Sequence, residues 1–257
     1  MSDTTRARFD LGRVLERLFG ALGRNFLVFF GLALILTGLP AALSAFAFAG
    51  RVDAASDGGR SLALFLAGSL IGFVSSFILQ ASIVHGAVMD LNGRRPTLVD
   101  CLTGGLRHFL PVLAISILAA IAVMFGLLIF LAPGIILLTV WAVVVPAQVV
   151  ENRGVFGAFG RSADLTDGHR WAIFALLVVW LIISFVIGAA ITGGALSLAA
   201  STGSSSAQAL VAWQGLAQPL ANALSAVISS TGIAALYVEL RRAREGAAPE
   251  DLAAVFD

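Results

Sequence analysis

The sequence contains one stretch, residues 171–238, that carries no charged side chain for 68 residues: WAIFALLVVWLIISFVIGAAITGGALSLAASTGSSSAQALVAWQGLAQPLANALSAVISSTGIAALYV. A soluble fold cannot bury so long a run, whereas a bilayer core about 30 Å thick takes roughly 20 apolar residues of helix for each crossing. The stretch therefore predicts two membrane spans, with the Ser/Gly-rich segment 201–206 as the turn between them. Three further blocks without Asp, Glu or Arg, 25–50, 61–89 and 108–150, predict one, one and two spans.

These blocks define the expected fold class, an all-α polytopic membrane helical bundle in a single domain. The composition agrees, since 59% of the residues are hydrophobic and only 12% are charged. Backbone groups in lipid must be paired within the protein, which helices achieve, and no alternating pattern favours a barrel. The six expected transmembrane helices form three hairpins and lie at about 26–48, 62–88, 109–131, 134–150, 171–196 and 209–237, followed by a tail over 238–257. Within the third block, Pro133-Gly134 is the expected turn.

All 16 positive charges of the chain are arginines, and their distribution predicts the orientation. Fourteen of them fall in four segments that alternate with the hairpins, against only Arg51 and Arg60 on the opposite side. Basic residues concentrate in the cytoplasmic loops of membrane proteins. We therefore expect a multi-pass protein of the bacterial inner membrane with both termini in the cytoplasm.

Each predicted hairpin follows a short segment with the pattern of an amphipathic helix. In the first segment, leucines recur at 11, 15, 18 and 22 while charged residues fill the remaining arc. Thr97 can cap a second short helix, and 155–170 forms a third. We expect all three to lie at the cytoplasmic membrane surface. Their similar junctions with the spans indicate either ordinary interfacial anchors or a threefold structural repeat.

One polar stripe lies within the predicted spans. Five side chains recur with helical spacing on the last span, and they are Gln214, Gln218, Asn222, Ser225 and Ser229. Polar groups in hydrocarbon need partners, so we expect this face to point into the bundle, with Gln80 on the second span as a candidate partner. The stripe either joins helices by hydrogen bonds or lines a hydrated site for a lipid or a small polar substrate.

The sequence offers no constellation with a recognisable chemistry. It has no nucleophile elbow, zinc-protease motif, phosphate-binding loop or dinucleotide fingerprint. Three scattered histidines and the single Cys101 do not predict a zinc site. No predicted span holds Asp, Glu or Arg, which proton-coupled carriers usually have at depth. We expect no catalytic residue, no cofactor, no metal and no nucleic-acid partner.

The segment from Glu151 to Trp171, ENRGVFGAFGRSADLTDGHRW, contains a spaced motif. It resembles the signature E-N … A-x-x-R-S-x-x-L-T-x-G-x-x-W of the membrane domain associated with bacterial glycerophosphoryl diester phosphodiesterases. The positions that match are Glu151, Asn152, Arg161, Ser162, Leu165, Thr166, Gly168 and Trp171. The resemblance implies a six-helix integral membrane module. It does not imply phosphodiesterase activity, because this chain lacks the soluble enzyme barrel of some relatives.

The side chains of this motif also support a physical prediction. Glu151, Arg161 and Asp164 can form an acid–arginine network that fixes the third interfacial helix to the fourth span. Thr166 can cap the start of the fifth span. The alternative role for the network is the binding of lipid headgroups.

The function that these features favour is non-enzymatic. We expect an integral inner-membrane protein that organises or binds membrane lipid, or that supports a membrane-protein partner or a second copy of itself. The first alternative is a transport component that uses the polar stripe of the last span. The second alternative is a membrane-embedded lipid enzyme.

Overall fold

The computed structural model describes residues 9–42, 44, 58–202 and 206–246. Within these ranges all regular secondary structure is helical, and six helices are long and apolar enough to cross a membrane. The predicted all-α bundle is thus confirmed. Its elements are α1 (Leu11–Ala33), the π-helix η1 (Leu34–Gly38), α3 (Gly58–Leu91), α4 (Leu98–Ile129), α5 (Leu131–Val140), α6 (Val144–Glu151), α7 (Val155–Thr166), α8 (Arg170–Thr202) and α9 (Ser206–Glu245).

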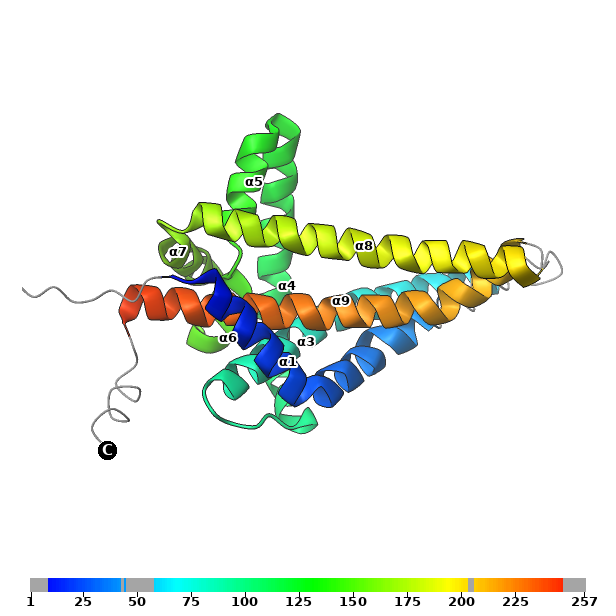
Figure 1. The fold of residues 1–257 in the computed structure, drawn as a ribbon, viewed down its shortest axis with the longest axis horizontal. Helices are drawn as coiled ribbons and strands as arrows, with labels where there is room; N and C mark the ends of the chain where they lie inside the picture. Colours follow the sequence, from blue (N-terminus) through cyan, green and yellow to red (C-terminus); the bar gives the residue numbers. More distant parts are fainter. Residues whose placement is uncertain (1–8, 43, 45–57, 203–205, 247–257) are drawn as a thin grey trace, which may run out of the picture.

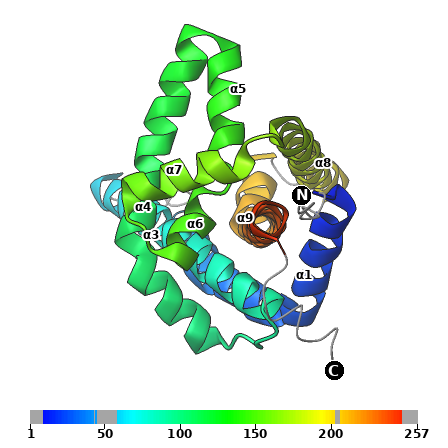
Figure 2. The same ribbon diagram turned by 90° about the vertical axis from the view of Figure 1, so that its left-hand side faces the viewer.

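α9 is the central helix of the bundle, with α1, α3 and α8 packed along it (Figure 1). Phe29, Leu79 and Val227 form part of one buried cluster where α1, α3 and α9 meet. The α4–α5 hairpin extends to one side and runs crosswise to α8 and α9, which Figure 2 views nearly end-on. Its tip is exposed, since Leu128 and Phe130 are 79% and 74% accessible. The hairpin therefore projects away from the rest of the bundle.

α1 joins the first predicted interfacial helix and the first span in one bent helix. The bend lies at Asn25, whose φ of −121° and ψ of 17° are not helical. The Asn25 side-chain amide donates to the carbonyl oxygen of Ala21 at 3.0 Å, which gives this buried group a partner. The first part of α1 packs against α9 in addition to any contact with the membrane surface, because Leu18 is buried while Leu15 stays exposed.

α3 and α4 approach closely because two consecutive glycines of α4 lack side chains. A Cβ on Gly104 would overlap the ring of His85. A Cβ on Gly105 would overlap the hydroxyl of Ser82 and lie 2.7 Å from the carbonyl oxygen of Ile78. Small residues allow this backbone approach between membrane helices. The pair of glycines thus fixes how α4 is seated on α3.

Gly105→Ala is therefore expected to lower the free energy of unfolding by about 1–3 kcal/mol, the usual cost of overpacking a tight contact. Thermal unfolding of the purified protein in detergent measures the change. Gly160→Ala on α7 is the control, because a Cβ there meets nothing within 4 Å. Equal melting temperatures for the two variants would show that α3 and α4 do not approach as closely as described.

The second predicted interfacial helix is not separate, because it forms the first turns of α4. Thr97 caps α4 as predicted: its hydroxyl accepts a hydrogen bond from the backbone N–H of Asp100, and the Asp100 carboxylate accepts one from the backbone N–H of Thr97. Pro111 lies inside the helix without ending it. α4 is consequently one helix of 32 residues.

The chain turns from α4 to α5 at Phe130, before the predicted Pro133-Gly134 turn. Phe130 is extended, with φ −159° and ψ 149°. Pro133 lies in the first turn of α5, where its missing N–H breaks no helical hydrogen bond. A Cβ on Gly134 would lie 2.8 Å from the backbone nitrogen of Leu127, so glycine is needed for the close approach of α5 to α4. The two residues therefore belong to the packed start of α5 and do not form the turn of the hairpin.

Two further boundaries differ from the sequence prediction. The predicted fourth span is divided by a turn at residues 141–143 into α5 and the interior helix α6, whose residues from Val144 to Val149 are all buried. α9 passes Pro219 and continues to Glu245, beyond the predicted end of the last span at 237. The first part of the expected tail is therefore helical, and residues 247–257 lie outside the described residues.

Candidate functional site

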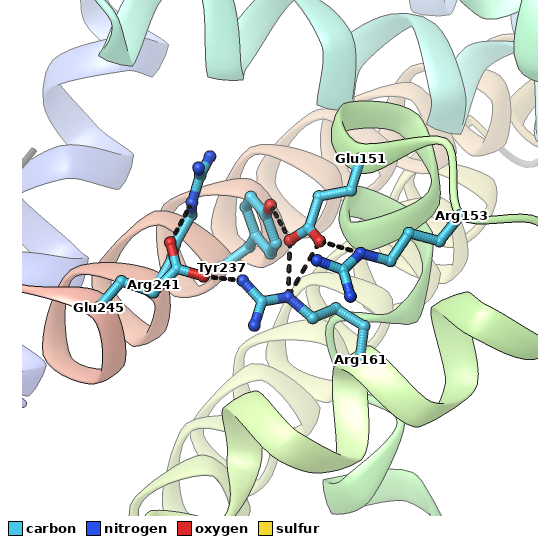
Figure 3. Close-up of polar contacts among 6 residues, drawn as sticks. All are labelled: Glu151, Arg153, Arg161, Tyr237, Arg241 and Glu245. Carbon is cyan, nitrogen blue, oxygen red and sulfur yellow. Dashed lines mark hydrogen bonds and ion pairs between the residues drawn. The ribbon is translucent and has the colours of Figure 1, made fainter.

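The charged side chains gather at the end of the bundle where the start of α1, α6, α7 and the end of α9 meet, which we call the arginine-rich end. Its main feature is the Glu151 network, drawn in Figure 3 and composed of Glu151, Arg153, Arg161, Tyr237, Arg241 and Glu245. The Glu151 carboxylate accepts hydrogen bonds from Arg161 Nε at 2.8 Å and from the Tyr237 hydroxyl at 2.8 Å. It also pairs with Arg153 Nε at 2.7 Å. One carboxylate thus holds three donors.

The rest of the network connects α7 with the end of α9. Arg161 pairs with Glu245 through its second guanidinium nitrogen, and Glu245 accepts from Arg241 Nε at 2.8 Å. Tyr237, Arg241 and Glu245 are spaced four residues apart, so they share one face of α9. The predicted Glu151–Arg161 pair is confirmed. Asp164, predicted to belong with it, is exposed and lies outside the network, because the second acid that contacts Arg161 is Glu245.

The electrostatics of Arg161 show that the network is well matched. The side chain is only 11% exposed, and this burial disfavours its charged form. Hydrogen bonds to Glu151 and Glu245 outweigh the burial, so the pKa of Arg161 is raised above its ordinary value. Arg161 therefore carries a charge that is neutralised within the protein.

Ser162 and Thr166 of α7 form hydrogen bonds with the backbone at the point where the predicted fourth span is broken. Their hydroxyls donate to the carbonyl oxygen of Val140 at 2.8 Å and 3.2 Å. Val140 is the last residue of α5, and its carbonyl is freed there from helical pairing. Thr166 is at the end of α7 and does not cap α8 as predicted, because its hydroxyl is buried against Val140 and the carbonyl of Ser162.

The remaining motif residues shape the chain around the network. Asn152 ends α6 in the left-handed conformation, with φ 47°, and its side chain accepts from Gln148 at 3.2 Å. Gly168 has φ 80° in the turn before α8, where a side chain would be strained. Leu165 is buried, whereas Trp171 is 86% exposed at the start of α8, as expected for an interfacial aromatic anchor.

A second cluster, which the sequence prediction missed, ties α1 to α9. Glu239 is 1% exposed and pairs with Arg13 at 2.9 Å and with Arg17 at 3.1 Å. Its position could have been suspected from the sequence. Glu239 follows Gly232 and Leu236 at helical spacing, so the acid lies on an apolar face of its helix. A third pair, Arg24 with Asp90 at 2.6 Å, joins α1 to α3.

The predicted polar stripe is not brought together as one buried face. Asn222 is exposed, and Ser225 and Ser229 are half-buried on α9. The side chains of Gln214 and Gln218 lie outside the described part of the structure. The candidate partner Gln80 is half-buried on α3.

Chemically, the arginine-rich end is a set of ion pairs between helices. Within residues 9–42, 44, 58–202 and 206–246, no group of three or more His, Cys, Asp or Glu side chains is placed to hold a metal ion. Each buried acid of the described part is engaged by arginine, which suits a clamp that fixes helices to one another. The chain matches no protein-family model, no curated protein and no solved structure.

Proposed function

We propose that the protein is a non-enzymatic integral protein of the bacterial inner membrane that binds and organises membrane lipid. The observation that carries the proposal is the α4–α5 hairpin, which runs crosswise to α8 and α9 (Figures 1 and 2). From Leu110 onward the exposed side chains of this hairpin are apolar, and they include Ile117, Ile121, Met124, Phe125, Leu128, Phe130, Leu131, Ile136 and Leu138. In water so large an apolar surface would drive aggregation, whereas acyl chains satisfy it.

The placement of the hairpin supports an organising role. α5 contacts α8, and α8 presents exposed apolar side chains of its own, among them Leu181, Ile182 and Phe185. Lipid acyl chains next to this contact touch two helices whose axes cross. Acyl chains beside a bundle of parallel helices touch helices whose axes all point along one line. We infer that the protein holds the lipid around this hairpin in place and thereby orders it.

The ionic clusters support the same proposal, because they give the charged residues a structural task. Glu151 and Glu239 hold α7 and α1 on opposite sides of the end of α9. Such clamps keep the arginine-rich end rigid at the border expected to face the cytoplasm. The hairpin is then the surface that meets lipid.

Native mass spectrometry of the protein released in mild detergent tests the proposal, and we expect retained phospholipid. Ile121→Ser/Leu128→Ser on the hairpin should retain less than the wild type, because hydroxyls weaken acyl-chain contact. Leu66→Ser/Leu70→Ser is the matched control on α3, where both leucines are exposed outside the hairpin. A bare wild-type protein, or equal retention by both double variants, would refute a lipid-organising hairpin.

Transport is a second candidate, favoured by Asn222. This polar side chain is exposed on a helix long and apolar enough to cross a membrane, so it can meet water or a small polar substrate. In a Cys101→Ala background, Asn222→Cys should react with a small polar thiol reagent if the face is hydrated. Protection from the reagent on both sides of the membrane would eliminate this candidate.

A further inference from the structure

One face of α4 carries an exposed apolar stripe from end to end. Seven residues form it: Val99, Leu106, Leu110, Ile117, Ile121, Met124 and Leu128. At about 100° per residue, their spacing places all seven within a narrow arc of the helix. The stripe begins in the turns that the sequence predicted to be interfacial and ends at the tip of the hairpin. Thr103 is the one polar residue in this arc, and its hydroxyl donates to the backbone carbonyl of Val99, so this face of α4 can still meet the membrane along its length.

Arginines accompany the stripe only at its beginning. Arg94 and Arg95 lie in the connection before α4, and Arg107 lies in its third turn, next to Leu106 and Leu110, which are 55% and 71% exposed. All three arginines are exposed. Asp100 is the one acid of segment 91–107, and its carboxylate is engaged by Thr97, so the segment keeps a net charge of +2 from three arginines and one aspartate.

These three arginines differ from the arginines that form ion pairs elsewhere in the structure. The structure pairs Arg13 and Arg17 with Glu239, Arg24 with Asp90, Arg153 and Arg161 with Glu151, Arg241 with Glu245, and Arg170 and Arg244 with Asp167. Arg242 is half-buried. Among the arginine side chains that the structure describes, Arg94, Arg95 and Arg107 are the exposed ones that form no ion pair with another described residue. Their charge is available to a partner.

We propose that Arg94, Arg95 and Arg107 bind the headgroups of anionic phospholipids, whose acyl chains lie along the α4 stripe. A guanidinium group donates two parallel hydrogen bonds to a phosphate and suits this ligand better than a point charge. Arg94 and Arg95 precede α4, and Arg107 lies nine residues beyond its first residue, a rise of about 14 Å along the helix, which fits an extended anionic lipid surface rather than one compact ion. The inference rests on the proposed lipid-binding function and names the lipid class and the place.

Titration with phosphatidylglycerol or phosphatidylcholine, followed by native mass spectrometry, measures the preference. The wild type should prefer phosphatidylglycerol. Each Arg→Gln change in the set should reduce the ratio of the two affinities about fivefold, since an arginine at an anionic surface contributes about 1 kcal/mol. Arg94→Gln/Arg95→Gln should therefore have a larger effect than Arg107→Gln. Because none of the three arginines forms an ion pair with another described residue, melting temperatures should stay unchanged.

Arg170→Gln/Arg244→Gln is the control with the same change in net charge, because both of its arginines pair with Asp167. It should leave the preference unchanged. An equal loss in the two double variants would reduce the site to general surface charge and overturn the inference. Displacement of phosphatidylglycerol by millimolar inorganic phosphate would overturn it in favour of a soluble phosphate ligand. Retention of both lipids without preference would contradict this inference alone, whereas retention of neither would contradict the proposed function.

Discussion

Glu151→Ala is expected to lower the free energy of unfolding by about 3 kcal/mol. The substitution removes the carboxylate that holds Arg161, Arg153 and Tyr237, and it leaves the Arg161 guanidinium, 11% exposed, with Glu245 alone. Removing one partner from a buried ion pair costs about 3–5 kcal/mol, because the remaining charge stays buried. The lower end applies, since Glu245 still pairs with Arg161. For a chain of this size the melting temperature should fall by about 6–12 °C.

Two variants show whether the loss comes from the buried part of the network. Arg153→Gln removes an arginine that is 54% exposed and should cost less than about 1 kcal/mol. Tyr237→Phe removes one hydrogen bond to a carboxylate and should cost about 1–3 kcal/mol. If Glu151→Ala melted at the same temperature as Arg153→Gln, the network would be a surface feature. If it kept its melting temperature but lost bound lipid, Glu151 would serve headgroup binding instead.

Glu239→Ala should be at least as damaging, at about 3–5 kcal/mol. Glu239 is 1% exposed between Arg13 and Arg17, so its removal takes away the carboxylate that both guanidinium groups share at the contact of α1 with α9. We expect the part of α1 before the Asn25 bend to detach. Hydrogen exchange should then lose protection in residues 11–24 while the core of α3 and α9 keeps it.

Glu16→Gln is the control for this variant, because Glu16 lies on the same part of α1 and is exposed. It should change the free energy of unfolding by less than about 0.5 kcal/mol. Unaltered exchange of α1 in Glu239→Ala would mean that apolar packing of Val14 and Leu18 alone holds the helix.

Both clusters act on the end of α9, and their geometry explains why this helix is longer than predicted. Tyr237 and Glu239 are two residues apart, so they point to nearly opposite sides of the helix. One side is held by α6 and α7, and the other by α1. Contacts on both sides keep the backbone helical through Arg241 to Glu245, where hydropathy no longer indicates a span.

The sequence was sufficient for the features that depend on local pattern. The charge-free blocks located the long helices, and the spacing from Glu151 to Arg161 brought these two side chains together as predicted. It was insufficient where the choice of partner is tertiary. Asp164 and Glu245 are both acids within reach of Arg161 in principle, and only the placement of α9 against α7 selects Glu245.

The turn of the second hairpin shows a different limit. Pro133-Gly134 reads as a turn because both residues interrupt regular structure in solution. At the start of a helix, however, proline is tolerated, and Gly134 serves the close approach of α5 to Leu127. The chain reverses direction at the single extended residue Phe130, and a phenylalanine gives no sequence signal for a turn.

The most direct test of the account measures what surrounds the α4–α5 hairpin in a bilayer. A nitroxide at Leu128, in a Cys101→Ala background and in vesicles of phosphatidylglycerol and phosphatidylcholine, reports its collision rates with oxygen and with a water-soluble nickel chelate. A hairpin in contact with acyl chains gives frequent collisions with oxygen and few with the chelate, which is the expected result. Frequent collisions with the chelate, or few with both reagents, would place the hairpin in water or under a protein partner and would contradict the account.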